Sequence, residues 1–158
     1  MRKHTWKPYV FWVLLTEGVG AVTGWLIRGG VLVYKLAVVK PPLTPPAVVF
    51  PIVWTALYAL MGVGAARVFL APDSSERTRS LQLFGAQLFF NLFWCILFFN
   101  FQAFGLALVW LAALWALIFW MLQSFQRVDP LAGALQWPYL LWTTFAVYLN
   151  LGVWLLNR

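Results

Sequence analysis

Residues 81–101 read LQLFGAQLFFNLFWCILFFNF, and this stretch decides the class of the protein. It carries no charged side chain, and a helix needs about 20 mostly apolar residues to cross the hydrocarbon core of a bilayer. The apolar residues form a continuous run rather than the alternating pattern of a membrane β-strand. The stretch therefore predicts a transmembrane helix.

Four other stretches have the same length and character, so the sequence predicts an all-α integral membrane protein built as a five-helix bundle. The expected spans are about 8–27, 47–70, 81–101, 104–122 and 131–156, within one transmembrane domain covering 1–158. The longest connection, 28–46, contains four prolines and is expected to be a stiff loop. A multi-pass protein of a bacterial cell membrane or an organelle membrane follows from this pattern.

The composition agrees with the membrane class, because the chain is 63% hydrophobic and only 9% charged, whereas soluble domains carry roughly 25% charged residues. The net charge is +7, but the basic residues stand at segment ends instead of clustering as nucleic-acid binding requires. We therefore expect anionic lipid headgroups, and no nucleic acid, as their partners. With one histidine and one cysteine, Cys95, no structural metal site is expected.

The basic residues are unequally divided between the two sides of a five-span chain, which favours a cytoplasmic N-terminus. The N-terminal side carries Arg2, Lys3, Lys7, Arg67, Arg77, Arg79 and Arg127, and the other side carries Arg28, Lys35, Lys40 and Arg158.

Three tryptophans, Trp54, Trp94 and Trp142, stand inside three different spans, where lipid contact alone would favour leucine. Flat rings with few polar atoms suit a flat, mostly apolar ligand. Trp54 and Tyr58 are four residues apart and share a helix face, although anchoring at the membrane interface would also explain an aromatic pair. The indoles thus predict a shared aromatic pocket.

Two polar features inside the spans admit two interpretations each. Gln87, Asn91 and Trp94 form one stripe, and its amides would either bond a ligand or bond neighbouring helices. Glu17 is an acid within a span, a position that is either functional or neutralised by a proton or partner. The sequence offers no nucleotide-binding loop and no hydrolytic triad, so it assigns no catalytic residue.

Two groups of residues form a recognisable pattern. The first is Lys40-Pro41-Pro42-Leu43-Thr44-Pro45-Pro46, followed by Phe50-Pro51 and Trp54-Thr55-Ala56-Leu57-Tyr58. The second is Arg28-Gly29, Tyr34, Gln87-Leu88, Asn91, Trp94, Phe98-Phe99, Pro138-Tyr139, Trp142, Phe145-Ala146, Leu149-Asn150 and Trp154. Through these residues the chain resembles the translocator protein family, also called tryptophan-rich sensory proteins or peripheral-type benzodiazepine receptors.

The resemblance implies a five-helix bundle with a pocket under the first loop, and usually a homodimer. Family members bind porphyrins such as protoporphyrin IX, sterols in some cases, and benzodiazepine-site drugs, so porphyrin is expected as a ligand and no cofactor is required. The family's pocket positions fall on Trp54, Asn91, Trp94, Trp142, Ala146 and Leu149. The positions where the loop closes over the pocket fall on Ile27, Pro45 and Pro46. Tyr58 is added to the predicted ligand-binding residues because it shares a helix face with Trp54.

The sequence departs from the family pattern in three ways. Leu43 replaces the usual tryptophan of the loop, which should weaken stacking over the pocket. No Arg or Lys falls within five residues after Tyr148, so the proposed cholesterol motif is not satisfied. Glu17 stands where an uncharged residue is expected and has no family role.

The leading hypothesis is a tetrapyrrole-binding sensor, carrier or scavenger in tetrapyrrole or stress regulation, with Arg28 or Lys40 meeting the propionates. The enzymatic alternative is light- and oxygen-dependent porphyrin degradation, which some bacterial members are reported to perform with tryptophans matching Trp54 and Trp142. The third alternative is a small-molecule transporter, whose usual signs are broken helices and intramembrane charges.

Overall fold

The computed structural model describes residues 5–158, and within them five helices are long and apolar enough to span a membrane. Arg2 and Lys3, which contribute to the charge bias, lie outside the described residues. The elements are α1 (Trp6–Leu26), α2 (Arg28–Ala37), α3 (Val49–Phe69), α4 (Ser75–Cys95), the π-helical turn η1 (Ile96–Asn100), α5 (Phe104–Val128), α6 (Pro130–Ala134) and α7 (Trp137–Leu156). The predicted all-α bundle of five spans is confirmed.

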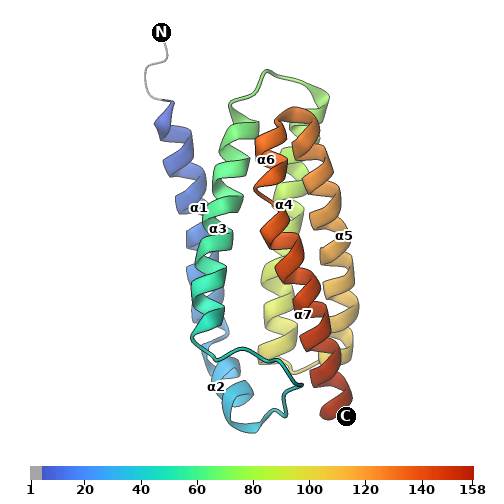
Figure 1. Ribbon diagram of the computed structural model, residues 1–158. Helices are drawn as coiled ribbons and strands as arrows, with labels where there is room; N and C mark the ends of the chain where they lie inside the picture. The colour runs from blue at the N-terminus through green and yellow to red at the C-terminus, as the bar shows by residue number, and fades with distance from the viewer. Residues whose placement is uncertain (1–4) are drawn as a thin grey trace.

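The long helices run alternately up and down, and the described part of the chain begins and ends at opposite ends of the bundle (Figure 1). α1 packs chiefly against α3, α4 against α5, and α5 against α7. The inward face of α5 forms much of the core, with the side chains of Leu111, Leu114, Ile118, Met121 and Phe125 fully buried. α2 and the extended segment after it lie across the end of the bundle that holds the C-terminus (Figure 1).

Two spans extend further than their apolar runs predict. α4 begins at Ser75, six residues before the predicted start, and Ser74 caps it by accepting a hydrogen bond from the Arg77 backbone N–H at 3.0 Å. α5 continues to Val128 instead of ending at residue 122. Hydropathy marks only the part of a helix that lies in hydrocarbon, whereas backbone hydrogen bonding continues into the polar headgroup region.

The first connection was predicted to be a stiff loop, and that prediction is wrong for its first ten residues, which form α2. This helix packs on η1, where Gly30 lies directly against the Phe99 backbone carbonyl. Asn100 Nδ2 also donates to the Leu26 carbonyl at 3.0 Å. Tertiary contacts therefore hold a helix whose two glycines would disfavour it in isolation.

The fifth span is not continuous, because it divides into α6 and α7 around Leu135 and Gln136. The Asp129 carboxylate caps α6 by accepting from the backbone N–H groups of Leu131 and Ala132, both at 3.0 Å. Pro138 lies in the first turn of α7, where its missing N–H removes no helical hydrogen bond.

Candidate ligand-binding site

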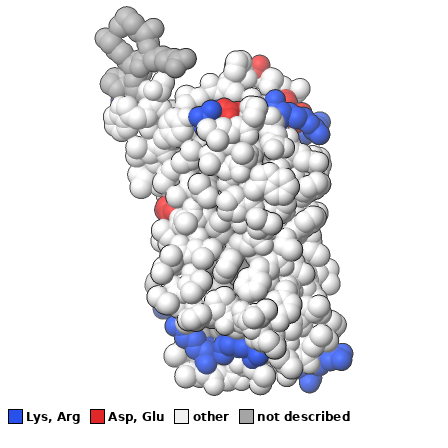
Figure 2. All heavy atoms as spheres, in the orientation of Figure 1, with Lys and Arg blue, Asp and Glu red and all other residues white. Residues whose placement is uncertain are grey.

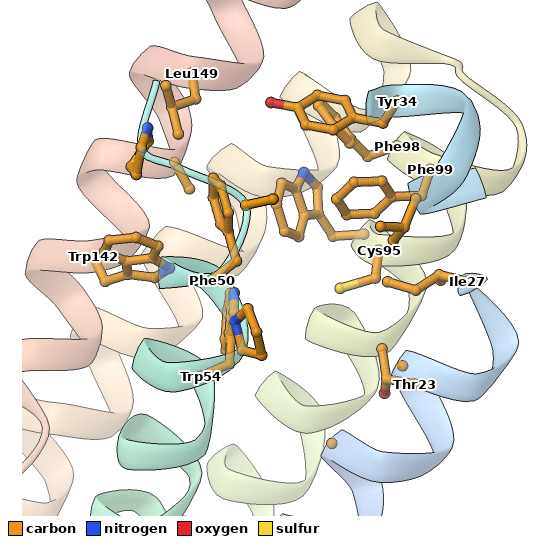
Figure 3. A pocket seen from close by; sticks show the side chains of 18 of the residues that line it. Thr23, Ile27, Tyr34, Phe50, Trp54, Cys95, Phe98, Phe99, Trp142 and Leu149 are labelled. Carbon is orange, nitrogen blue, oxygen red and sulfur yellow. The ribbon is translucent and has the colours of Figure 1, made fainter. Parts of the chain in front are cut away.

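A cavity of about 970 Å³ lies between α1, α3, α4 and α7, and α2, η1 and the loop before α3 enclose it further. Its volume is at the upper end of the range of about 300–1,000 Å³ that is usual for small-molecule pockets. Phe50, Trp54 and Trp142 lie on one side of the hollow, and Tyr34 and the aromatic pair of η1 lie on the other (Figure 3). α5, which is central to the core, does not line it.

The structure brings nearly all the residues predicted for the site to this one cavity. The predicted residues that line it are Ile27, Pro45, Pro46, Trp54, Tyr58, Trp94, Trp142, Ala146 and Leu149. Asn91, the remaining one, does not line it.

Trp54 of α3 and Trp142 of α7 are half-buried and supply ring surface to the cavity. The Trp54 ring centroid lies 5.7 Å from that of Tyr58, and the Trp142 centroid lies 5.9 Å from that of Phe50 in an edge-to-face arrangement. Among residues 5–158 neither indole N–H has a hydrogen-bond acceptor. Both rings therefore retain an N–H and an aromatic surface for a ligand.

Trp94 of α4 also lines the cavity, but its side chain is fastened to the bundle. Its indole Nε1 donates to Asn150 Oδ1 of α7 at 3.0 Å, and Asn150 Nδ2 donates in turn to the Phe104 carbonyl at 2.9 Å. The Trp94 side chain is only 8% exposed, and its ring packs against Phe98 with centroids 5.5 Å apart. These contacts make Trp94 a structural wall of the cavity.

Asn91 belongs to a buried polar network between helices. Its Nδ2 donates to Tyr139 Oη of α7 at 2.7 Å, and Tyr139 Oη donates to Gln87 Oε1 at 2.7 Å. Tyr58 Oη of α3 approaches Asn91 Oδ1 at 3.4 Å. Of the two interpretations of this amide stripe, the geometry supports interhelical hydrogen bonding, and the pocket role of Asn91 stays a prediction.

The loop between α2 and α3 covers the cavity and is held by α7. Tyr148 Oη donates to the Pro42 carbonyl at 2.7 Å. Asn157 Oδ1 accepts from the Val39 N–H at 2.9 Å, and Asn157 Nδ2 donates to the Val39 carbonyl at 2.7 Å. Leu43, at the position of the family's usual tryptophan, is 81% exposed and does not line the cavity.

Basic side chains ring the covered end of the cavity, which is also the basic end of the bundle visible in Figure 2. Arg28, Lys35 and Lys40 all line it. Lys40 Nζ lies 4.8 Å from the Tyr34 ring centroid, a cation–π arrangement at the mouth. Burial raises the pKa of the Tyr34 hydroxyl above its ordinary value, so Tyr34 is a neutral hydrogen-bonding group there.

Several lining residues were not predicted as part of the site. Phe98 and Phe99 come from η1, and Gly20 and Gly24 come from α1. A Cβ at Gly20 would lie 2.6 Å from the Tyr58 ring, so this glycine allows α1 to approach α3. Gly20 and Gly24 are four residues apart, the small-xxx-small spacing that allows helices to approach closely, and the contact of Gly20 with Tyr58 is made within the monomer.

Comparison with known proteins agrees with this architecture, because the sequence model of the TspO/MBR family matches residues 11–155. The chain belongs to the TspO/MBR family. It is 32% identical to the translocator protein of Ovis aries over 155 residues, covering 97% of this chain and 92% of the relative.

Two bacterial relatives match a shorter stretch. The tryptophan-rich protein TspO of Chlorobaculum tepidum is 38% identical over 125 residues, covering 78% of this chain and 79% of the relative. Protein CrtK of Rhodobacter capsulatus is 36% identical over 119 residues, covering 75% of this chain and 74% of the relative. The TspO/MBR family thus spans bacteria and animals, and the chain is a multi-pass integral membrane protein.

Proposed function

We propose that this protein binds tetrapyrroles such as protoporphyrin IX in the cavity, as a sensor, carrier or scavenger in tetrapyrrole or stress regulation. The observation that carries the proposal is the convergence of the half-buried indoles of Trp54 and Trp142, from separate helices, on one hollow. A flat, aromatic ligand matches these rings in shape and polarity.

The cavity also suits the uneven polarity of a tetrapyrrole that carries propionates. Its wall beneath the loop is mainly aromatic and aliphatic, and the basic groups of Arg28, Lys35 and Lys40 gather at the covered end. The propionates would lie at this end, where charge-assisted hydrogen bonds are stronger than neutral ones. The macrocycle would lie between the α3–α7 and η1 sides, each well-placed aromatic contact adding about 0.5–1.5 kcal/mol beyond burial.

Titration of the purified protein in lipid nanodiscs with protoporphyrin IX tests the proposal, with tryptophan emission and porphyrin absorbance as readouts. Trp54→Phe and Trp142→Phe should each weaken binding about three- to tenfold, as expected for about 1 kcal/mol of lost ring contact. Trp120→Phe is the matched control, because Trp120 is exposed on α5 and does not line the cavity. Absence of saturable binding, or equal effects of all three substitutions, would refute the proposal.

The same variants separate binding from the enzymatic alternative, in which Trp54 and Trp142 take part in photo-oxidative degradation. The bound porphyrin is illuminated in air and its absorbance is followed against free porphyrin at equal light dose. Bleaching no faster than in the free pigment supports binding alone. Bleaching that is faster and is lost in both cavity variants supports the enzyme.

Transport and assembly are separate proposals for the same chain. Porphyrin flux into sealed liposomes containing the protein would distinguish a carrier from a binding protein. The homodimer implied by the resemblance is tested by native mass spectrometry from detergent, where a single monomer mass at all concentrations would contradict it. Sterol competition in the porphyrin titration tests whether a sterol shares the cavity.

A further inference from the structure

The cavity has a second charged feature, Glu17, far from its basic end. Glu17 lies in the middle of α1 and lines the cavity together with Ile27 at the end of that helix. Their separation of ten positions in the sequence corresponds to about 15 Å along the helix axis. The cavity therefore reaches from the covering loop into the middle of the membrane, where a lone acid is found.

The face of α1 that carries Glu17 is formed by small residues. Gly20, Ala21 and Gly24 follow Glu17 at helical spacing and line the cavity with it. Ala21 and Gly24 are exposed, and a Cβ at Gly24 would meet nothing within 4 Å. The side chains on this face are therefore short and leave free space beside α1.

The free space lies between two contacts that join α1 and α2 to α4 and η1. On the N-terminal side of Glu17, Trp12 packs edge to face on Phe84 with ring centroids 5.6 Å apart. On the other side, Asn100 of η1 bonds the Leu26 carbonyl. Within residues 5–158, no side-chain hydrogen bond or aromatic contact joins α1 to α4 between these two contacts, and Ala21 and Gly24 are exposed there. We call this stretch the α1–α4 window.

The Glu17 carboxylate accepts no hydrogen bond and forms no ion pair within residues 5–158. Acidic patches occur at one end of the bundle in Figure 2, and another lies on the flank between the ends. A carboxylate at this depth is costly unless it takes a proton or a cationic partner. The charged side chains that line the rest of the cavity are the three cations at the covered end, so they do not neutralise Glu17 locally.

We propose that Glu17 is the recognition group for the amine of an amphiphilic ligand that enters the cavity from the bilayer through the α1–α4 window. An ammonium and a carboxylate, or the amine and the carboxylic acid after proton transfer, neutralise each other in a medium of low polarity. The apolar part of the ligand then lies along Gly20, Gly24 and the Trp54 ring. This inference rests on the cavity of the proposed function and assigns it a second ligand class.

Nanodisc titration calorimetry with dodecylamine and dodecanol, each corrected with empty nanodiscs, tests the amine preference directly. The two probes have the same chain, so the difference reports the head group. Wild-type protein should bind the amine at least tenfold more tightly than the alcohol, and Glu17→Gln should remove this preference while changing alcohol affinity less than twofold. Asp73→Asn is the control, because Asp73 is an exposed acid outside the cavity.

Equal affinities of wild-type protein for the two probes, or equal amine binding by the Glu17→Gln and Asp73→Asn proteins, would overturn the proposal. A second variant, Gly24→Leu, fills the space beside α1 where the apolar chain lies without changing charge, and it should weaken binding of both probes at least fivefold. Unchanged affinity in that variant would overturn the placement of the ligand along α1.

Parallel porphyrin titration keeps the two proposals distinguishable. Glu17→Gln should leave porphyrin affinity within twofold, whereas Trp54→Phe should lower it. An amine preference in a protein that fails to bind porphyrin would sustain the Glu17 site and refute the tetrapyrrole function. Porphyrin binding without an amine preference would sustain the tetrapyrrole function and refute the Glu17 site.

Discussion

Replacing Trp94 by phenylalanine should lower the stability of the bundle more than it lowers the affinity for the ligand. The substitution keeps an aromatic ring against Phe98 but removes the Nε1 donor that bonds Asn150 Oδ1 at 3.0 Å. Asn150 is 1% exposed, so its oxygen would lose this partner in a site that water does not reach freely. A buried polar group left unpaired costs about 1–3 kcal/mol, and interhelical hydrogen bonds in membranes are worth about 0.6–1.7 kcal/mol.

Unfolding in mixed micelles, followed by circular dichroism, measures this cost. We expect Trp94→Phe to lower the free energy of unfolding by about 1–2 kcal/mol, with Asn150→Leu as the partner variant of a double-mutant cycle. The cycle isolates the hydrogen bond from the smaller ring volume, because the volume change occurs in both backgrounds. Coupling near zero, or a loss of porphyrin affinity in Trp94→Phe greater than in Trp54→Phe, would refute the structural role.

Three further predictions concern the covering loop and the opposite end of the bundle. Tyr148→Phe removes the 2.7 Å hydrogen bond to the Pro42 carbonyl. Stopped-flow measurements should therefore show ligand dissociation about five times faster, as expected for about 1 kcal/mol lost. An unchanged rate would contradict a role of this hydrogen bond in holding the loop over the cavity. Leu43 has a backbone φ of 69°, and asparagine tolerates this region better than leucine does. Leu43→Asn should therefore raise the free energy of unfolding by about 0.5–1 kcal/mol. A decrease in the free energy of unfolding would contradict this reasoning. Burial alone would raise the pKa of Asp129, but the Arg67 guanidinium and two backbone N–H groups hold it below its ordinary value. The resulting stability is present above the unfolded pKa of about 3.9 and is lost as pH falls through the lower folded pKa, so the acid dependence of unfolding should be smaller in Asp129→Asn.

The five spans could be predicted because hydrocarbon imposes a length and a polarity on any crossing helix. Residues 81–101 illustrate how far this goes, since the apolar run marks the part of α4 and η1 within the bilayer and says nothing about where the helix begins. η1 could not be predicted, because a π-helical turn differs from an α-helix only in which carbonyl each N–H selects. α2 was missed for a related reason, since its stability comes from contact with η1.

The site was predicted well for residues whose type alone indicates contact with a ligand. It was predicted less well for residues whose place in the cavity or the core depends on how their helix is rotated. Trp54 and Trp142 reach the cavity as the sequence indicated. Asn91 and Trp94 are three residues apart, so they differ by about 60° around α4. The boundary between cavity and core falls within this angle, leaving Trp94 on the cavity wall and Asn91 against Tyr139. Only the neighbouring helices fix that boundary.

The departure at Leu43 changes how closure of the cavity should be understood. Its exposed side chain provides no stacking over the cavity, yet the loop is tied to α7 by Tyr148 and Asn157. Gly152 strengthens this attachment, because a Cβ there would lie 2.5 Å from Pro41 and would push the loop away. Closure therefore depends on α7 and the loop backbone, while the window beside Glu17 lies on α1. A ligand released through the loop should respond to substitutions in α7, and one exchanged with the bilayer should not. The ratio of the dissociation rates of Tyr148→Phe and Gly24→Leu consequently identifies the route that each ligand takes.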